Sequence, residues 1–164
     1  MVYLREMVVI NILLTGGKMY KIVSKKEIGP KVYSCEIYNL EIAKSAKAGQ
    51  FIIFRIDDKG ERVPLTVVGT NPKEGLVRII FQEMGKSTMH LASLNEGDCI
   101  KDFVGPLGCP TKIKKYGTVI AVAGGVGAAE VLPVIKELKK VGNKVITIVG
   151  ARCKDLLILE DELR

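Results

Sequence analysis

A strand, a helix and a second strand follow one another in the last third of the chain, and this order constrains the fold more than any other feature. Residues 118–123 form a continuous apolar run, which is typical of a strand buried on both faces. Apolar residues then recur at helical spacing over 131–138, with lysines on the other face. Gly142-Asn143 ends the helix, and 144–149 is a second apolar run. The pattern predicts a parallel β-α-β unit, and another helix is expected to begin at Asp155.

Four residues, Gly124, Gly125, Val126 and Gly127, join the first strand to the helix. Glycines at such a turn let the backbone and the positive end of the helix dipole approach a dinucleotide phosphate. The turn lacks the full G-x-G-x-x-G spacing, and a tight turn without a ligand explains it equally well when it is taken alone. Arg152, just after the second strand, is placed either to meet a phosphate or to be solvated.

Upstream of this unit, short β-type runs alternate with turn signals. Six such runs predict a six-stranded antiparallel β-barrel, and they cover residues 20–28, 31–38, 50–56, 63–69, 76–82 and 98–104. A short helix over 87–94 separates the last two runs. Gly105-Pro106-Leu107-Gly108 then breaks the pattern. We therefore expect a barrel domain over 19–110 and a partial α/β domain over 111–164.

Residues 1–18 stand apart from both parts. The apolar stretch 7–14 is too short for a transmembrane helix and lacks the cleavage site of a secretory signal. Gly16-Gly17 is what a purine-rich ribosome-binding sequence spells when it is translated, and Met19 follows at the usual gap. We therefore expect a leader over 1–18 and a native start at Met19.

Composition and charge argue against several classes of protein. Hydrophobic residues make up 48% of the chain, so it is expected to fold. The net charge is +7, but the lysines are scattered and aromatics are only 5%, which makes nucleic-acid binding a weak hypothesis. The four cysteines lack C-x-x-C spacing and His90 is the single histidine, so no metal site is expected. The thiols are expected to be reduced and mostly buried in a cytoplasmic protein.

The sequence Gly85-Lys86-Ser87-Thr88 matches the end of a Walker A phosphate loop, but the rest of that motif is missing. Ile80 stands where the first glycine is required, and only about two turns of helix follow. A weaker inference survives, because a helix N-terminus beside Lys86 suits a phosphate. Taken alone, the stretch is better explained as a capped surface helix.

Several motifs, in this order, resemble the ferredoxin–NADP reductase superfamily. They are AGQFIIFRID, ERVPLTVV, FQEMGKST, FVGPLG, AGGVGAAEVLP and GARCKDLLILEDEL. They are most similar to the flavin subunit of NADH-dependent ferredoxin:NADP oxidoreductase, also called sulfide dehydrogenase beta subunit. The electron-transfer subunit of dihydroorotate dehydrogenase is related. The likeness runs from Met19 to the last residue and covers the N-terminal part of the family pattern, with the first half of its nucleotide-binding domain.

The resemblance implies a site for FAD and a site for NAD(P)H as substrate. It places the Thr66 hydroxyl near the flavin N5 and assigns no catalytic acid, base or metal ligand. The residues implied to bind FAD are Arg62, Pro64, Leu65, Thr66, Gly85, Lys86, Ser87 and Thr88, and those implied to bind the nicotinamide nucleotide are Gly124, Gly125, Val126 and Gly127.

The chain departs from the family pattern at three places. Arg62 lies four residues before Thr66 instead of three, which turns its side chain to the other face of the strand. Glu130 stands where a proline usually follows the glycine turn. The cysteines of the family's two-iron two-sulfur cluster have no counterpart, so we expect no cluster in this chain.

The function implied is that of an FAD-binding, NAD(P)H-linked electron-transfer subunit. It would pass electrons between a nicotinamide and iron–sulfur carriers, with a larger iron–sulfur/flavin oxidoreductase subunit and ferredoxin, or a similar carrier, as partners. Neither nucleic acid nor membrane is expected as a partner. The alternatives are the dihydroorotate dehydrogenase electron-transfer subunit, or a truncated, non-catalytic remnant of such a subunit.

Overall fold

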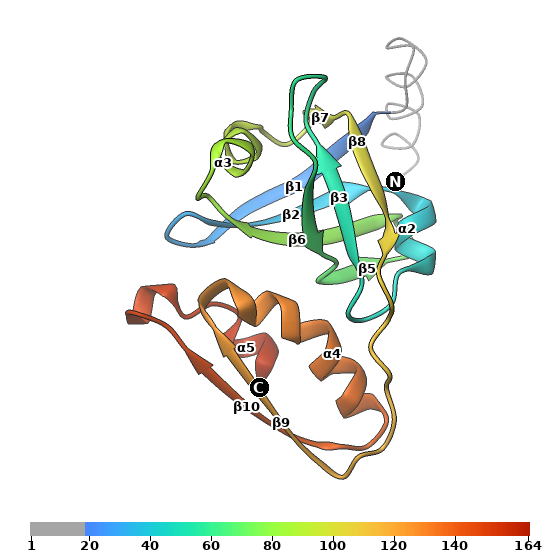
Figure 1. The fold of residues 1–164 in the computed structure, drawn as a ribbon, viewed down its shortest axis with the longest axis vertical. Coiled ribbons are helices and arrows are strands. Elements are labelled where there is room, and N and C mark those ends of the chain that lie inside the picture. The colour runs from blue at the N-terminus through green and yellow to red at the C-terminus, as the bar shows by residue number, and fades with distance from the viewer. Residues whose placement is uncertain (1–18) are drawn as a thin grey trace.

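The computed structural model describes residues 19–164, and the leader predicted over 1–18 lies outside these residues. Its first part consists of two antiparallel sheets (Figure 1). One sheet has the strand order β5-β6-β2-β1-β7 and the other has the order β4-β3-β8. The strands are β1 (Tyr20–Gly29), β2 (Val32–Tyr38), β3 (Phe51–Arg55), β4 (Val63–Thr66), β5 (Gly69–Asn71), β6 (Leu76–Gln82), β7 (Cys99–Ile100) and β8 (Asp102–Leu107).

Two of the six predicted runs are each split in two, so the prediction of six strands is wrong. The run over 63–69 becomes β4 and β5 because the chain changes sheets between them. The Val67 N–H donates to the Gln50 carbonyl (3.0 Å), whereas the next N–H, of Val68, donates to the Arg78 carbonyl (2.9 Å). The run over 98–104 is split at Lys101, since β7 pairs with β1 and β8 pairs with β3.

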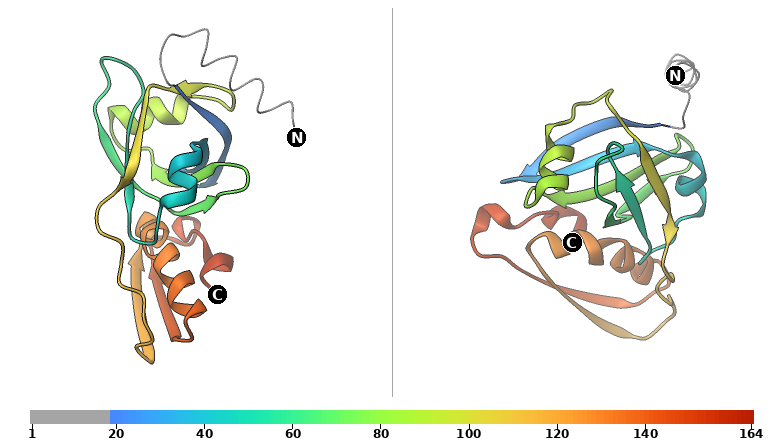
Figure 2. Two further views of the ribbon diagram at one scale, coloured as in Figure 1. Left: turned by 90° about the vertical axis from the view of Figure 1, so that its right-hand side faces the viewer. Right: turned by 45° about the horizontal axis from the view of Figure 1, so that its top comes forward.

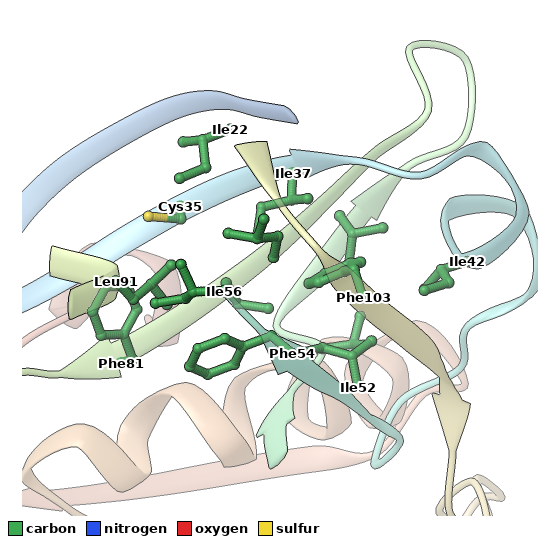
Figure 3. Packing of buried hydrophobic residues seen from close by; sticks show 14 of the residues in the cluster. Ile22, Cys35, Ile37, Ile42, Ile52, Phe54, Ile56, Phe81, Leu91 and Phe103 are labelled. Carbon is green, nitrogen blue, oxygen red and sulfur yellow. The ribbon is translucent and has the colours of Figure 1, made fainter. Parts of the chain in front are cut away.

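The main hydrophobic core lies between the two sheets (Figure 3). Alternate residues of β3 and its continuation, Ile52, Phe54 and Ile56, point into it, as the period of two in a strand requires. Phe81 of β6 and Phe103 of β8 fill the core from the two sheets and are almost fully buried.

Two helices flank these sheets, α2 (Leu40–Ser45) and α3 (Lys86–Ser93). Asn39 begins α2, because its Oδ1 accepts a hydrogen bond from the Ile42 N–H at 3.1 Å. The other end of the amide, Nδ2, donates to the Phe103 carbonyl at 3.4 Å, which ties the start of the helix to β8. Helix α3 is anchored by Leu91, which is fully buried in the core.

The predicted β-α-β unit is confirmed. It consists of β9 (Thr118–Gly124), a turn of 3-10 helix (Gly125–Gly127), α4 (Ala128–Lys140) and β10 (Lys144–Gly150). The two strands are parallel and in register from Thr118 opposite Lys144 to Gly124 opposite Gly150. The turn after α4 is fixed by buried Asn143, whose Oδ1 accepts from the backbone N–H groups of Tyr116 and Gly117.

The helix predicted to begin at Asp155 does not form as one element. The chain instead makes a turn of 3-10 helix (Lys154–Leu156) and the short α5 (Glu160–Leu163). Leu159 has a positive φ of 61°, which a continuous helix cannot contain. This break lets Ile158 and Leu163 both be buried against α4 and the strands.

A second hydrophobic cluster joins α4 to the outer side of the first part of the chain. From the first part it contains Val32 of β2, Ile80 of β6, and Val68, which lies between β4 and β5. From the last third it contains Ala123, Ala128, Ala129, Leu132, Ile135, Ile158 and Leu163. The left view of Figure 2 shows α4 and α5 on one side of β9 and β10. No described element covers the other side, where Ile120, Val122, Ile146 and Ile148 are exposed.

The expectation of mostly buried thiols is wrong for the cysteines of the described residues. Cys35 is buried and Cys99 is half-buried, but Cys109 and Cys153 are exposed. Burial raises the pKa of the Cys35 thiol to about 12, so this cysteine stays a protonated core residue at neutral pH. Within residues 19–164, no helix is long and apolar enough to span a membrane.

An ion-pair cluster around Glu162 also links the two parts. The Glu162 carboxylate accepts from the Arg78 guanidinium of β6 at 2.8 and 3.0 Å and from the Lys136 ammonium of α4 at 2.7 Å. The Arg78 Nε donates to the Ser34 hydroxyl. Burial by itself raises the pKa of Glu162, but the hydrogen bonds from Lys136 and Arg78 outweigh it and hold the pKa below its usual range.

We expect the Glu162→Gln substitution to lower the free energy of unfolding at pH 7 by about 1 kcal/mol, as the pairs are partly solvated. Because the folded-state pKa is lowered, this stabilisation exists above the unfolded pKa of about 4.3 and is lost as the pH falls through the folded value. The measurement is urea unfolding at pH 7 and pH 3, with exposed Glu160→Gln as the control. If the free energies of unfolding of wild type and variant differed by the same amount at both pH values, the prediction would be contradicted.

Candidate functional site

A cleft of about 660 Å³ lies between β4, the end of β6 and the start of α4. From β4 it is lined by three of the predicted residues, Pro64, Leu65 and Thr66. Thr88 of α3 and Val126 of the glycine turn line it from the other elements. The remaining lining residues are Phe51, Ile80, Phe81, Gln82, Met84, Ala129 and Glu130. The cleft therefore brings together predicted residues from three separate stretches of the sequence.

A second cleft, of about 450 Å³, continues from the first, because Gln82 and Val126 line both. Gly124, Gly125 and Val126 form one of its sides. Gly150, the last residue of β10, forms another side together with Ala151 and Arg152, which follow the strand. Since these segments follow the carboxyl ends of two parallel strands, the cleft lies where ligands bind in open α/β sheets.

A third and smaller cleft, of about 230 Å³, lies beside α3 and is lined by Lys86, Ser87 and His90. Asp57, Lys59 and Glu61 of the β3–β4 connection line it as well. The Ser87 hydroxyl donates to the Glu61 carboxylate at 3.0 Å. In this structure Ser87 is thus engaged with an acidic side chain, and Lys86 is the nearest basic group on the same helix.

The predicted glycines leave their backbones open. A Cβ atom added at Gly85, Gly124, Gly125 or Gly127 would meet no atom within 4 Å. Gly125 also has a positive φ of 51°, a conformation that side chains rarely adopt. A bound phosphate would therefore find space directly above the peptide groups at both turns.

Thr88 has a structural role at the start of α3. Its hydroxyl accepts from the N–H groups of Met84 and Gly85, each at 3.0 Å. These bonds hold the turn that precedes the helix, and Gly85 is the N-cap residue. Gly85 itself lines none of the three clefts. Its contribution is the shape of the turn that presents Lys86 and Ser87.

Arg62 is the one predicted residue on β4 or beside it that points away from the cleft. Its side chain is 64% exposed, and its Nη2 lies 3.6 Å from the Asp102 carboxylate. Asp102 also accepts a hydrogen bond from the Arg55 Nε at 2.6 Å. Strict strand alternation would place Arg62 on the same face as Pro64 and Thr66, but Arg62 precedes β4, and its side chain lies beside Asp102 instead of lining the cleft.

Most residues that line the first and second clefts were not among the predicted site residues. Gln82, Met84 and Phe51 line the first cleft, and Glu130 and Arg152 line the first and second clefts, respectively. Glu130 stood out in the sequence because it departs from the family pattern, and Arg152 stood out because it is a basic residue directly after a strand. For Gln82 the sequence contains one indication of a role in the site, because it is the last residue of an apolar strand just before a glycine turn. Phe51 and Met84 had none.

The residues that line the first cleft are suited to binding a ligand. Among the residues that the structure describes, Glu130 is the only ionisable one that lines the first cleft. No group of three His, Cys, Asp or Glu residues within 19–164 could hold a metal ion. A largely apolar cleft with a few polar groups and adjoining open glycine turns suits a flat aromatic cofactor with phosphates.

Comparison with known proteins supports this interpretation. No protein-family model matches the chain. The "Dihydroorotate dehydrogenase B (NAD(+)), electron transfer subunit homolog" of Thermotoga maritima is 46% identical over 149 residues, which are 91% of this chain and 53% of the relative. The corresponding electron transfer subunit of Streptococcus pneumoniae strain R6 is 30% identical over 148 residues, covering 87% of this chain and 57% of the relative. The chain thus spans about half the length of these relatives.

Solved structures agree in fold. The structure of NADH-dependent reduced ferredoxin-NADP oxidoreductase, described in the context of flavin-based electron bifurcation, matches 92% of this chain and 54% of its own. The TM-score is 0.85 and the identity is 45%. Phthalate dioxygenase reductase, at 20% identity and a TM-score of 0.73, covers 92% of this chain and 49% of its own, and shows the fold alone. The chain is thus similar in sequence to these electron transfer subunits and in both sequence and fold to the ferredoxin-NADP oxidoreductase.

Proposed function

We propose that this chain binds FAD and takes part in electron transfer between a nicotinamide nucleotide and a protein partner. The observation that carries the proposal is a single cleft lined by Leu65 and Thr66 of β4, Thr88 of α3 and Val126 of the glycine turn. The relatives named above are electron transfer subunits or oxidoreductases, which supports the same function.

The residues present fit FAD. In the proposal, Pro64 and Leu65 form an apolar wall along the flavin ring, and Thr66 offers a hydroxyl to a ring nitrogen. Lys86 and Ser87 hold the pyrophosphate at the start of α3, where the open turn at Gly85 leaves room. FAD would supply the redox chemistry, taking electron pairs from the nicotinamide and releasing single electrons.

The other turn and Arg152 would bind the nicotinamide nucleotide. The phosphates of the nucleotide would lie over the Gly124–Gly127 backbone in the second cleft. The nicotinamide ring would reach the first cleft past Val126. Residues 19–110 would then be an FAD-binding barrel and residues 111–164 part of an NAD(P)-binding domain. A larger iron–sulfur/flavin subunit, and ferredoxin or a similar carrier, would be the partners.

The absorbance spectrum of the purified protein tests the proposal. We expect a yellow protein with flavin bands, and about one FAD per chain after reconstitution and gel filtration, with the flavin identified by chromatography after heat release. A folded protein that stays colourless when FAD is added would contradict FAD binding and favour a non-catalytic remnant. Reduction of the bound flavin by NADH and by NADPH, compared with dithionite, then tests the nicotinamide site.

The name of the Thermotoga relative favours a second candidate, the electron transfer subunit of a dihydroorotate dehydrogenase. The two functions differ in the partner that exchanges electrons with the flavin. The FAD-loaded chain would be mixed with a dihydroorotate-oxidising subunit or with reduced ferredoxin and its oxidoreductase subunit. Dihydroorotate-dependent bleaching of the flavin would select the second candidate, and ferredoxin-dependent bleaching the first.

A further inference from the structure

Glu130 is distinguished by charge from everything else that lines the first cleft. The other lining residues are apolar, or carry the neutral hydroxyl and amide groups of Thr66, Thr88 and Gln82. Glu130 is exposed, and the structure shows no ion pair for its carboxylate among residues 19–164. A single negative charge without an ion pair among the described residues therefore faces this cleft.

The position of Glu130 is held by its neighbours in the first turn of α4. Ala128 and Ala129 directly before it are fully or almost fully buried, at 0% and 2% exposure, in the cluster that packs α4 on the strands. Ala129 also lines the cleft. Because this turn cannot rotate without exposing both alanines, the backbone of Glu130 stays on the cleft side.

A fixed negative charge distinguishes the two redox forms of a nicotinamide. The oxidised ring carries a positive charge, whereas the reduced ring is neutral, and the phosphates and riboses are the same in both. Opposite charges attract more strongly in a partly apolar cleft than in water. Resting on the proposed function, we propose that Glu130 makes this cleft favour the oxidised nicotinamide over the reduced one, by holding a carboxylate beside the ring.

The nearby basic groups do not cancel this preference. Arg152 lines the second cleft, beside the glycine turn, and Lys86 lines the third. Both are placed toward phosphate positions, which are common to the oxidised and reduced nucleotides. Arg152 and Lys86 therefore change the affinities for the oxidised and the reduced nucleotide by the same factor and leave the ratio of the two affinities unchanged. The Glu130 carboxylate changes this ratio, because it acts on the ring.

The test compares NAD⁺ and NADP⁺ with their 1,4,5,6-tetrahydro analogues, whose rings are neutral and cannot reduce the flavin. Dissociation constants are measured by difference absorbance with the FAD-loaded protein. We expect Glu130→Gln to weaken binding of the oxidised nucleotide about 10-fold, the size of a typical contact to a charged group, and to change analogue binding less than about 2-fold. Glu130→Asp should retain most of the wild-type ratio between the affinities for the oxidised nucleotide and the neutral analogue. Glu137→Gln, on the same helix but outside the cleft, is the matched control.

A second readout is the reduction potential of the bound flavin, which should rise in Glu130→Gln because a negative charge disfavours the electron-rich reduced flavin. Equal effects on the oxidised nucleotide and the analogue, or no effect on either, would overturn the inference. A yellow wild type that binds the oxidised nucleotide no better than the neutral analogue would overturn it as well and leave FAD binding intact. A colourless wild type would instead overturn the proposed function, and the inference with it.

Discussion

Replacing Leu132 by alanine is expected to lower the free energy of unfolding by about 2–5 kcal/mol. Leu132 lies on α4, has no exposed surface and belongs to the cluster that includes Val32, Val68 and Ile80 of the first part of the chain. The lost methyl groups leave a cavity where α4 meets these residues, so the penalty exceeds the transfer free energy of the removed atoms. For a chain of this size the melting temperature should fall by roughly 4–20 °C.

Val141→Ala provides the control, because Val141 ends the same helix but is 42% exposed. This control should change stability by about 0.5 kcal/mol or less. Calorimetry with and without FAD measures both variants. If Leu132→Ala melted like the wild type, α4 would not be held by this cluster, and the geometry of the first cleft would need another explanation.

The sequence predicts most of the elements because their patterns are local. Apolar runs of strand length, the helical spacing over 131–138 and the glycine turn all depend on neighbours in the chain. The same is true of Pro64, Leu65 and Thr66, which one short motif identified and which line the first cleft. These predictions needed no knowledge of the tertiary structure.

The predictions that failed depend on contacts between distant residues. The run over 63–69 looks continuous, but two of its successive N–H groups donate to different partners. One bonds the carbonyl of Gln50, just before β3, and the next bonds that of Arg78 in β6, which belongs to the other sheet. The helix expected from Asp155 has good local propensity, yet burial of both Ile158 and Leu163 against α4 requires a break at Leu159. Local patterns contain neither requirement.

The cleft shows the same division. Pro64 and Thr66 were found from a motif, because their stretch carries the family resemblance. Phe51 and Met84 line the same cleft, but each is an ordinary apolar residue in sequence and is selected only by tertiary position. The charge of Glu130 was visible in the sequence, whereas its being the only ionisable group of the cleft depends on which other residues gather there.

Lys86→Glu is expected to weaken FAD binding by about 10- to 100-fold or more. A contact between a charged group and a phosphate contributes about 1.5–3 kcal/mol, and reversal of the charge adds repulsion. Asp57 and Glu61 line the same small cleft, and Lys86 and Lys59 are the two lysines that offset them, so reversal of the Lys86 charge leaves the cleft acidic. The measurement is FAD retention after gel filtration together with a fluorescence titration. Lys73→Glu, in an exposed turn between β5 and β6, makes the same charge change away from the clefts.

The position of Lys86 separates loss of binding from loss of folding. Lys86 is the first residue of α3, whose first turn contains no acidic residue. A glutamate there interacts favourably with the positive end of the helix dipole, by about 0.3–1 kcal/mol. The FAD-free variant should therefore melt at or slightly above the wild-type temperature while it loses FAD. Equal FAD affinity in Lys86→Glu and Lys73→Glu would show that the pyrophosphate does not lie at the start of α3, and the flavin would then have to be placed elsewhere along the cleft.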